Sequence, residues 1–451
     1  MPKSAPMAPR AAAALRRGAR AVVAGRAPRP RRRLPGLWRY LAVVGPGLIV
    51  ANAGNDAGGI FTYTQTGSKY GLGLLWAFLP ILVALIVIQE MVARLGCVTG
   101  KGLMDLIRER FGVRWTLFAS LVVMVANTGT VIAEFAGIAG ALDLLGVPKT
   151  AAVTSSAVVL VVLVLRANRR LVERVFLALG LAFISYIVTA VTVHPDWHDV
   201  GHALTPSLSH HATAPGATPY ALDIITLIGT TITPYMQLFL QSSIVDKGTS
   251  ERDLRYARLD VITGSIFAQM VAAFIVITAA STLFTQCGAQ GCLAGQDLTS
   301  TDVAARALAP LAGEHAKQLF AIGLLGASLL AAAVLPLSTA FVICEAFGAE
   351  RSVQRRFTEA PLFFSLFIVI MVAGAGSILV IGQGSLTAVA LGTQTLDGIL
   401  LPVLLVFILV LANDRRLLGR HRNHLANNSV AGLLTAVLIG LTAALLVKTV
   451  F

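Results

Sequence analysis

Residues 45–59 decide how the chain folds: Gly45-Pro46-Gly47-Leu48-Ile49-Val50-Ala51-Asn52-Ala53-Gly54-Asn55-Asp56-Ala57-Gly58-Gly59. They lie in the first strongly apolar segment, yet they include one proline, five glycines and one acid. In a helix interior, glycine costs about 1 kcal/mol and proline about 3 kcal/mol relative to alanine. A lone carboxylate at bilayer depth costs about 2.5–3.5 kcal/mol. The pattern predicts a broken transmembrane helix whose freed carbonyls and Asp56 face a cavity. The alternative is a kinked helix in which Asp56 bonds a neighbouring helix.

A second interrupted segment lies at the matching place in the second half of the chain. It reads Leu227-Ile228-Gly229-Thr230-Thr231-Ile232-Thr233-Pro234-Tyr235-Met236-Gln237. Pro234 removes a backbone donor and frees a carbonyl about one turn earlier, near Thr230. Together the two breaks offer one carboxylate, several hydroxyls and unwound carbonyls near the bilayer midplane. Such an all-oxygen environment suits a hard cation.

The composition is that of a polytopic helical membrane protein. Of the 451 residues, 56% are hydrophobic and 13% are charged, and the mean hydropathy is +0.77. The net charge of +14 suggests an anionic partner when taken alone, but 11 of the 36 Lys and Arg precede residue 41 and most others lie in short loops. We find no base-reading, phosphate-cradling or nucleotide motif and no nucleophile–base arrangement. We therefore expect no nucleic-acid binding, no enzyme activity and no cofactor.

Eleven apolar stretches are long enough to span the bilayer. Their approximate limits are 41–64, 72–93, 115–142, 150–166, 174–193, 219–245, 259–285, 317–347, 360–381, 385–412 and 426–447. With the N-terminus inside, 31 of the 36 Lys and Arg fall on the inner side. This asymmetry predicts a multi-pass protein with a cytoplasmic N-terminus and an extracellular C-terminus. We expect it in the plasma membrane, that is, the bacterial inner membrane.

Ten spans plus one suggest two repeats of five spans, inverted because five is odd. We expect a disordered, basic cytosolic tail at 1–38 that touches anionic lipid. The ten-helix transport core covers 39–412, with repeats at 41–193 and 219–412, and the eleventh transmembrane helix lies in 413–451. We reject a twin-arginine signal in the tail, because the apolar stretch that follows is long, interrupted and succeeded by many more spans.

The two long outer loops carry histidines and cysteines. Three histidines are spaced i, i+4, i+8, so a helix there would align His194, His198 and His202 for metal binding; a solvated loop is the alternative. Cys287 and Cys292 face the oxidising side, where a local structural disulfide can form. Cys97 and Cys344 are expected to be free, and Glu90, Asp223 and Glu345, near the ends of spans, are expected to be interfacial.

From about residue 40 to 445 the chain resembles the NRAMP family of divalent-metal transporters. Asp56-Ala57-Gly58-Gly59 aligns with the family's Asp-Pro-Gly-Asn, and Thr233-Pro234-Tyr235 aligns with its Met-Pro-His. Ile132-Ala133-Glu134-Phe135 looks like the third-span segment with its acid, and Gly392-Thr393-Gln394, followed by Leu401-Pro402, is similar to the Gln-containing tenth span. The resemblance implies an all-α polytopic membrane protein with a LeuT-type 5+5 inverted repeat and an eleventh transmembrane helix.

The chain departs from that family at several positions. Gly59 stands for the asparagine ligand, Thr233 for the sulfur ligand, Tyr235 for a histidine and Val131 for an acid. The family's second histidine aligns near Leu240 or Gln241, so this chain has no histidine there. This combination resembles the NRAMP-related magnesium transporter branch, which is implied to import Mg²⁺ and Mn²⁺ without proton coupling. Loss of a thioether removes a bias towards late transition metals. A wider, oxygen-lined site also fits a partly hydrated Mg²⁺.

We expect four metal-binding residues: Asp56, Gly59, Thr230 and Thr233. The surrounding cavity is expected to include Ala53, Gly58, Glu134, Tyr235, Gln394 and Asp397, although Glu134 could instead be a protonated acid bonded between helices. The predicted function is secondary or passive import of Mg²⁺ and Mn²⁺ without proton coupling. We expect a monomer in the lipid bilayer, with the metal as substrate. The alternatives are a proton-coupled Mn²⁺ or Fe²⁺ symporter of the same family and an amino-acid permease of the same fold.

Overall fold

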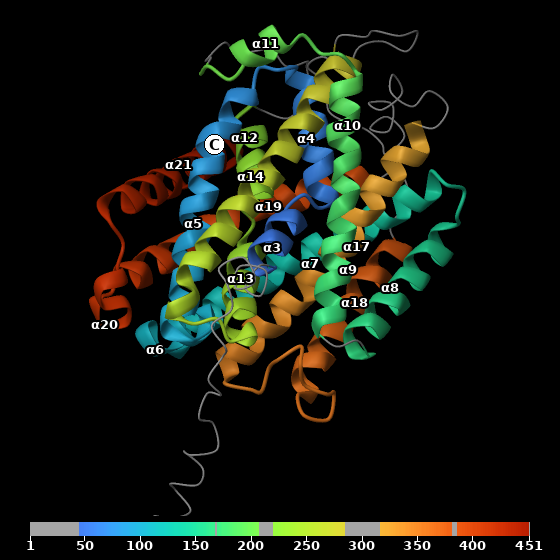
Figure 1. The fold of residues 1–451 in the computed structure, drawn as a ribbon. Coiled ribbons are helices and arrows are strands. Elements are labelled where there is room, and N and C mark those ends of the chain that lie inside the picture. Colours follow the sequence, from blue (N-terminus) through green and yellow to red (C-terminus); the bar gives the residue numbers. More distant parts are fainter. Residues whose placement is uncertain (1–44, 167–168, 207–219, 285–315, 381–385, 451) are drawn as a thin grey trace, which may run out of the picture. The chain divides into compact units, whose positions relative to one another are not determined.

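All regular structure in the described part of the chain is helical. The computed structural model describes residues 45–166, 169–206, 220–284, 316–380 and 386–450, all within one unit, Val43–Phe451. The helices of the first half are α3 (Pro46–Ala53), α4 (Ala57–Tyr70), α5 (Phe78–Thr99), α6 (Leu103–Phe111), α7 (Val113–Asp143), α8 (Lys149–Arg166), α9 (Arg169–Gly180), α10 (Ile184–Thr192) and α11 (Trp197–His202). Those of the second half are α12 (Tyr220–Thr231), α13 (Pro234–Lys247), α14 (Leu254–Ala279), α17 (Ala316–Phe347), α18 (Pro361–Val380), α19 (Leu386–Asn413), α20 (Arg415–Leu418) and α21 (Leu425–Val450). Each of the eleven predicted spans coincides with one of these helices or with a consecutive pair, which confirms the all-α prediction (Figure 1).

The two predicted interruptions are confirmed. Within the described ranges, nine helical stretches are long and apolar enough to cross a membrane unbroken. The other two spans consist of half-helices: α3 and α4 with 8 and 14 residues, and α12 and α13 with 12 and 14. At about 1.5 Å rise per residue, none of these halves reaches across a hydrocarbon core of about 30 Å. Each pair must therefore cross the bilayer together, with its break between the two membrane surfaces.

Local sequence explains both breaks. In the first, Asp56 is extended (φ −70°, ψ −176°), and its side chain accepts a hydrogen bond from Gly59 N–H and so starts α4. In the second, Pro234 is the first residue of α13 and Thr233 before it is extended (φ −72°, ψ 148°). A residue before proline favours that conformation, and proline fits the first turn of a helix because no donor is needed there.

The two broken helices pack against each other at the centre of the bundle. α3 contacts α13 and α4 contacts α12, as the inverted repeat requires (Figure 1). α14 packs against α3 and α4, whereas α7 packs against α17 and α19. The half-helix ends are therefore enclosed by long, continuous helices.

A carboxylate of α14 anchors the start of α3. Asp260 Oδ2 accepts a hydrogen bond from Gly47 N–H at 2.7 Å, and Oδ1 accepts from Gly45 and Leu48 N–H at 3.2 and 3.3 Å. A Cβ atom on Gly47 would lie 2.9 Å from this carboxylate, and one on Gly264 would lie 2.9 Å from the Gly47 carbonyl oxygen. Glycines at these two positions let α3 and α14 approach closely enough for Asp260 to cap the start of α3.

Some predictions fall on residues outside the described ranges. These are the tail at 1–38 and the disulfide between Cys287 and Cys292. Within the described ranges, Cys97 and Cys344 are free and buried, which confirms the prediction for those two residues.

Candidate metal-binding site

Asp56 occupies the break between α3 and α4. Its Oδ1 accepts a hydrogen bond from Gly59 N–H at 2.6 Å, so the carboxylate caps the N-terminus of α4. The partial positive charge of that helix end stabilises an anion there. The Asp56 side chain has an exposed fraction of 0%. A helix N-terminus alone compensates only part of a buried carboxylate's charge, so this position favours a cation as a further partner.

Gln394 approaches Asp56 from α19. Its Nε2 lies 3.3 Å from Asp56 Oδ1 and 3.4 Å from Oδ2, so the amide donates to the carboxylate. Gly58 makes room for this contact, because a Cβ atom there would lie 2.0 Å from Gln394 Nε2. Among the described residues, Gln394 Oε1 has no hydrogen-bond partner. One end of the amide therefore covers Asp56 while the other offers an unused acceptor.

Two further buried acids lie near Asp56. Glu134, on α7, accepts a hydrogen bond at Oε2 from Ala57 N–H at 3.1 Å, and so also approaches the start of α4. Asp397, on α19, accepts at Oδ2 from the hydroxyl of Thr130, one turn before Glu134, at 3.0 Å. Three carboxylates from different parts of the chain therefore gather around the first break.

Gly59 leaves a small space that oxygen atoms line. A Cβ atom on Gly59 would lie 3.1 Å from the Gly54 carbonyl oxygen, 3.2 Å from Asp56 Oδ1 and 3.5 Å from Thr230 Oγ1. Within the described ranges, the Thr230 hydroxyl has no hydrogen-bond partner. The two breaks thus present carboxylate, carbonyl and hydroxyl oxygens to the same small volume.

Tyr235 connects the two broken helices. Its hydroxyl donates to the carbonyl oxygen of Ala53, the last residue of α3, at 2.6 Å. Thr233 is fully buried at the start of α13, and its side chain does not cap that helix. The Ala53 carbonyl is therefore engaged by Tyr235, which places Tyr235 beside the first break.

The candidate site is closed to solvent on all sides. Every polar side chain proposed for it from the sequence has an exposed fraction of 0%, namely Asp56, Glu134, Thr230, Thr233, Tyr235, Gln394 and Asp397. The structure is therefore an occluded arrangement, and a solute can reach the site only after helices move.

Sequence reasoning missed one sulfur atom. A Cβ atom on Gly54 would lie 3.0 Å from Met236 Sδ, so the thioether packs directly on the first break. Met236 is buried in α13, three residues after Thr233. That spacing places both residues on one side of the helix, and it could have drawn attention to Met236.

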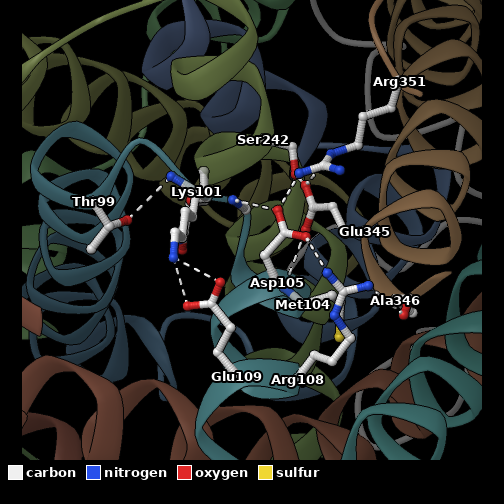
Figure 2. A network of polar contacts seen from close by, with 12 residues as sticks. Thr99, Lys101, Met104, Asp105, Arg108, Glu109, Ser242, Glu345, Ala346 and Arg351 are labelled. Carbon is white, nitrogen blue, oxygen red and sulfur yellow. Dashed lines mark hydrogen bonds and ion pairs between the residues drawn. The ribbon is translucent and has the colours of Figure 1, made fainter. Parts of the chain in front are cut away.

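At the α6 end of the bundle, Glu345 joins three elements (Figure 2). It lies two residues before the end of α17 with an exposed fraction of 1%, so it is buried among the helices, and its expected position at the membrane interface stays a prediction. Its carboxylate accepts from the hydroxyl of Ser242 on α13 at 2.6 Å and from Met104 N–H on α6 at 3.1 Å. Arg351 Nε lies 3.5 Å from the same carboxylate and Arg351 also pairs with Asp105. This network, the Glu345 network, holds the end of α13 against α6 and α17.

At the α11 end, an ion pair joins α4 to α12. Lys69 Nζ lies 2.7 Å from Asp223 Oδ2, which also accepts from the Tyr70 hydroxyl at 2.6 Å. Lys69 and Tyr70 each have an exposed fraction of 1% and Asp223 one of 7%. The pair lies inside the packed helices near the start of α12, and the position at the membrane interface expected for Asp223 stays a prediction.

Residues 47–448 match the family described as natural resistance-associated macrophage protein-like. The chain is 32% identical over 426 residues to the divalent metal cation transporter MntH of Ralstonia nicotianae, covering 89% of this chain and 90% of that protein. It is 29% identical over 426 residues to MntH of Aeromonas hydrophila, covering 91% and 96%. The crystal structure of the Eremococcus coleocola manganese transporter matches with a TM-score of 0.72 at 22% identity, covering 91% of this chain and 87% of that one. Mhp1, a nucleobase-cation-symport-1 family transporter in a closed conformation, matches with a TM-score of 0.52 at 17% identity, covering 86% and 81%.

These findings agree with the geometry of the chain. At their low identities, the structural matches show the fold, a LeuT-like inverted repeat in which two broken helices meet. The sequence matches cover most of the chain and name transporters, not enzymes. The chain therefore belongs to the natural resistance-associated macrophage protein (NRAMP) family of membrane-spanning divalent-metal transporters.

Proposed function

We propose that this transporter imports hard divalent cations, Mg²⁺ and Mn²⁺, through a site centred on Asp56. The observation that carries the proposal is the set of unused buried oxygens around that carboxylate. Among the described residues, Thr230 Oγ1, Glu134 Oε1, Gln394 Oε1 and Asp397 Oδ1 lack hydrogen-bond partners. Buried polar atoms are normally paired, and several unpaired oxygens near carboxylates favour a cation as the common partner.

The ion would engage Asp56, the oxygen-lined space at Gly59 and the Thr230 hydroxyl. Gln394 would then turn its amide, so that Oε1 replaces Nε2 on the side of the ion. Gly59 has no side chain to compete with the ion for the oxygens around it, and movement of the helices would make room for the water that the ion keeps. Mg²⁺ sheds water reluctantly and commonly binds through one or two carboxylates.

The selectivity proposal rests on Thr233 and Gly59. A hydroxyl at Thr233 gives no preference for soft metals, whereas a thioether would favour late transition metals over Mg²⁺. The Met236 sulfur packs on the first break, against Gly54. We propose that Met236 acts in packing, so that oxygen atoms alone contact the ion.

A second candidate function is proton-coupled uptake of Mn²⁺. Two observations favour it: the named relatives are divalent metal cation transporters MntH, and Asp397 gives Glu134 a second acid nearby through Thr130. Buried acids in membrane transporters often form proton relays. Import without proton coupling requires instead that Glu134 and Asp397 carry no protons across the membrane and act on the ion only through their charge.

Transport requires the occluded site to open alternately at its two ends. The distribution of Lys and Arg supports a cytosolic α6 end and an extracellular α11 end. We propose that release to the cytosol breaks the Glu345 network, because that network ties α13 to α6 and α17. The Lys69–Asp223 pair keeps α4 and α12 together as one outer unit.

Proteoliposomes test the function. Purified protein is reconstituted, and uptake of Mg²⁺, Mn²⁺ and Ca²⁺ is followed together with internal pH under a potassium-valinomycin voltage clamp. The proposal expects uptake of Mg²⁺ and Mn²⁺ with no accompanying acidification. Uptake of Mn²⁺ alone with metal-dependent acidification would support the second candidate and overturn the first.

A further inference from the structure

The histidine-bearing segment after α10 forms a short helix with an inward and an outward side. α11 spans Trp197–His202, and Val200 at its centre is buried against the core with an exposed fraction of 8%. His198 and His202 flank Val200 by two residues on either side and are exposed. The buried valine fixes the helix to the body of the protein, and both imidazoles lie on its exposed side.

The two imidazole rings face each other with their Nε2 atoms. His198 Nε2 lies 3.2 Å from His202 Nε2, and the ring centroids are 4.4 Å apart with an interplanar angle of 72°. Histidine binds zinc at about 2.0–2.1 Å, so two nitrogens on one ion lie about 2.9–3.4 Å apart for bond angles between square and tetrahedral. The observed spacing falls within that range, which means that a metal could bridge the nitrogens with little side-chain movement.

Carboxylates stand beside this pair. Ligand atoms of Asp196, His198 and Asp199 lie within 4.8 Å of one another, and His198 Nδ1 is 4.0 Å from Asp199 Oδ1. Asp196 Oδ1 is engaged by His198 N–H and Asp199 N–H, at 2.8 and 3.4 Å, as the cap of α11. Asp199 is therefore the carboxylate nearer to hand for the second ring nitrogen of His198, and a side-chain rotation would bring it within hydrogen-bond distance. Such a partner orients histidine ligands and raises their basicity.

We propose that His198 and His202 form a surface binding site for a late first-row transition metal, Zn²⁺, Ni²⁺ or Cu²⁺. Two imidazole nitrogens bind the ion, Asp199 supports His198, and water completes the coordination. Imidazole ligands suit these metals, and the affinity order places Cu²⁺, Ni²⁺ and Zn²⁺ above Mn²⁺. The site therefore takes metals other than the cations proposed for Asp56, and it does not depend on the transport proposal.

His194 supplies a matched control. The sequence spacing aligned three histidines, but α11 begins at Trp197, and His194 lies before it with φ 51°. Its Nδ1 lies 2.6 Å from the carbonyl oxygen of Thr192. The predicted alignment is thus wrong for His194 and right for the other two, because the helix starts after His194.

The test uses the full chain with Asp56→Ala, which removes the transport site from the measurement. Zn²⁺ binding is measured by calorimetry in detergent, and bound Cu²⁺ is examined by electron paramagnetic resonance. We expect one equivalent of Zn²⁺ and a Cu²⁺ spectrum with two nitrogen ligands. His198→Gln or His202→Gln, added to Asp56→Ala, should abolish the zinc equivalent or lower its affinity at least about tenfold, and leave at most one nitrogen on Cu²⁺. His194→Gln should change neither result.

Three outcomes overturn the inference. The first is one full zinc equivalent of unchanged affinity in His198→Gln/His202→Gln. The second is loss of binding in His194→Gln or in His210→Gln/His211→Gln with both α11 histidines present. The third is a Cu²⁺ spectrum that keeps two nitrogen ligands after His202→Gln. In the background with Asp56 intact, His198→Gln/His202→Gln should transport Mn²⁺ at the normal rate, which shows that these variants fold.

Discussion

The side-chain amide of Gln394 faces the carboxylate of Asp56 across 338 positions of sequence, with Nε2 3.3 Å from Oδ1 and 3.4 Å from Oδ2. The amide hydrogens of Gln394 carry partial positive charge, so they stabilise the Asp56 carboxylate as a cation would, but more weakly. Rotation of the amide would present its unpaired Oε1 to an ion instead. This relationship links the proposed ligand on the first broken helix to α19.

Gly58→Ala should separate these two residues. The added Cβ would lie 2.0 Å from Gln394 Nε2, so the glutamine side chain must move, and overpacking costs about 1–3 kcal/mol. We expect Mn²⁺ and Mg²⁺ uptake to fall at least about tenfold, together with a lower melting temperature. The matched control is Gly392→Ala on the same helix as Gln394, where a Cβ meets nothing within 4 Å. Equal uptake by the two variants would contradict the role given to Gln394.

Thr233→Met should shift selectivity towards soft metals. A thioether at the second break favours late transition metals and Cd²⁺ over Mg²⁺. We expect tighter Cd²⁺ or Mn²⁺ binding and weaker Mg²⁺ transport, measured by competition in proteoliposomes. If Mg²⁺ competes with Mn²⁺ as well as in the unaltered protein, Thr233 does not face the ion.

Met236→Leu distinguishes a packing role from a ligand role for the sulfur near Gly54. Leucine keeps a similar volume, and such exchanges usually cost less than about 1.5 kcal/mol. We expect an unchanged ratio of Mg²⁺ to Mn²⁺ uptake. A marked loss of Mn²⁺ uptake with Mg²⁺ uptake preserved would show that Met236 Sδ contacts the ion.

Glu345→Ala should loosen the α6 end of the bundle. The change leaves the Ser242 hydroxyl and the Met104 N–H without their buried acceptor. Removing one partner from a buried charged network typically costs about 3–5 kcal/mol. We expect faster amide hydrogen exchange in α13 and α6, measured by mass spectrometry. Glu350→Ala removes an exposed acid five residues later and should leave exchange unchanged. Unaltered exchange in α13 of Glu345→Ala would show that the network does not hold that helix.

Much of the fold follows from local patterns. Gly54, Asp56 and Pro234 interrupt their helices for reasons that act within a few residues, so both breaks could be predicted from sequence. The start of α11 at Trp197 depends on Asp196, which caps the helix, and a start three residues after His194 leaves His194 outside it. Asp223 and Glu345 are expected at the interface because they lie near span ends, whereas their burial comes from partners on other helices, which the sequence does not reveal.

The site could be predicted only as a set of residue types. The resemblance to a family aligned Asp56, Glu134 and Gln394, but it gave no contact between them. The pairing of Asp397 with Thr130 and the position of Met236 against Gly54 arise from how α19, α7 and α13 pack. Such contacts depend on side-chain direction across separate helices, which spacing along one segment does not determine.

Uptake by Asp56→Ala in proteoliposomes tests the central claim most directly. Asp56 is the carboxylate at the first break, so its removal should reduce both Mg²⁺ and Mn²⁺ uptake to the level of empty liposomes while the protein remains folded. The control is Asp143→Ala, which removes an exposed acid at the end of α7. An inside-negative potential should speed uptake by the unaltered protein, since a divalent ion gains about twice 2.3 kcal/mol per 100 mV. Near-normal Mg²⁺ and Mn²⁺ uptake by Asp56→Ala would contradict the account.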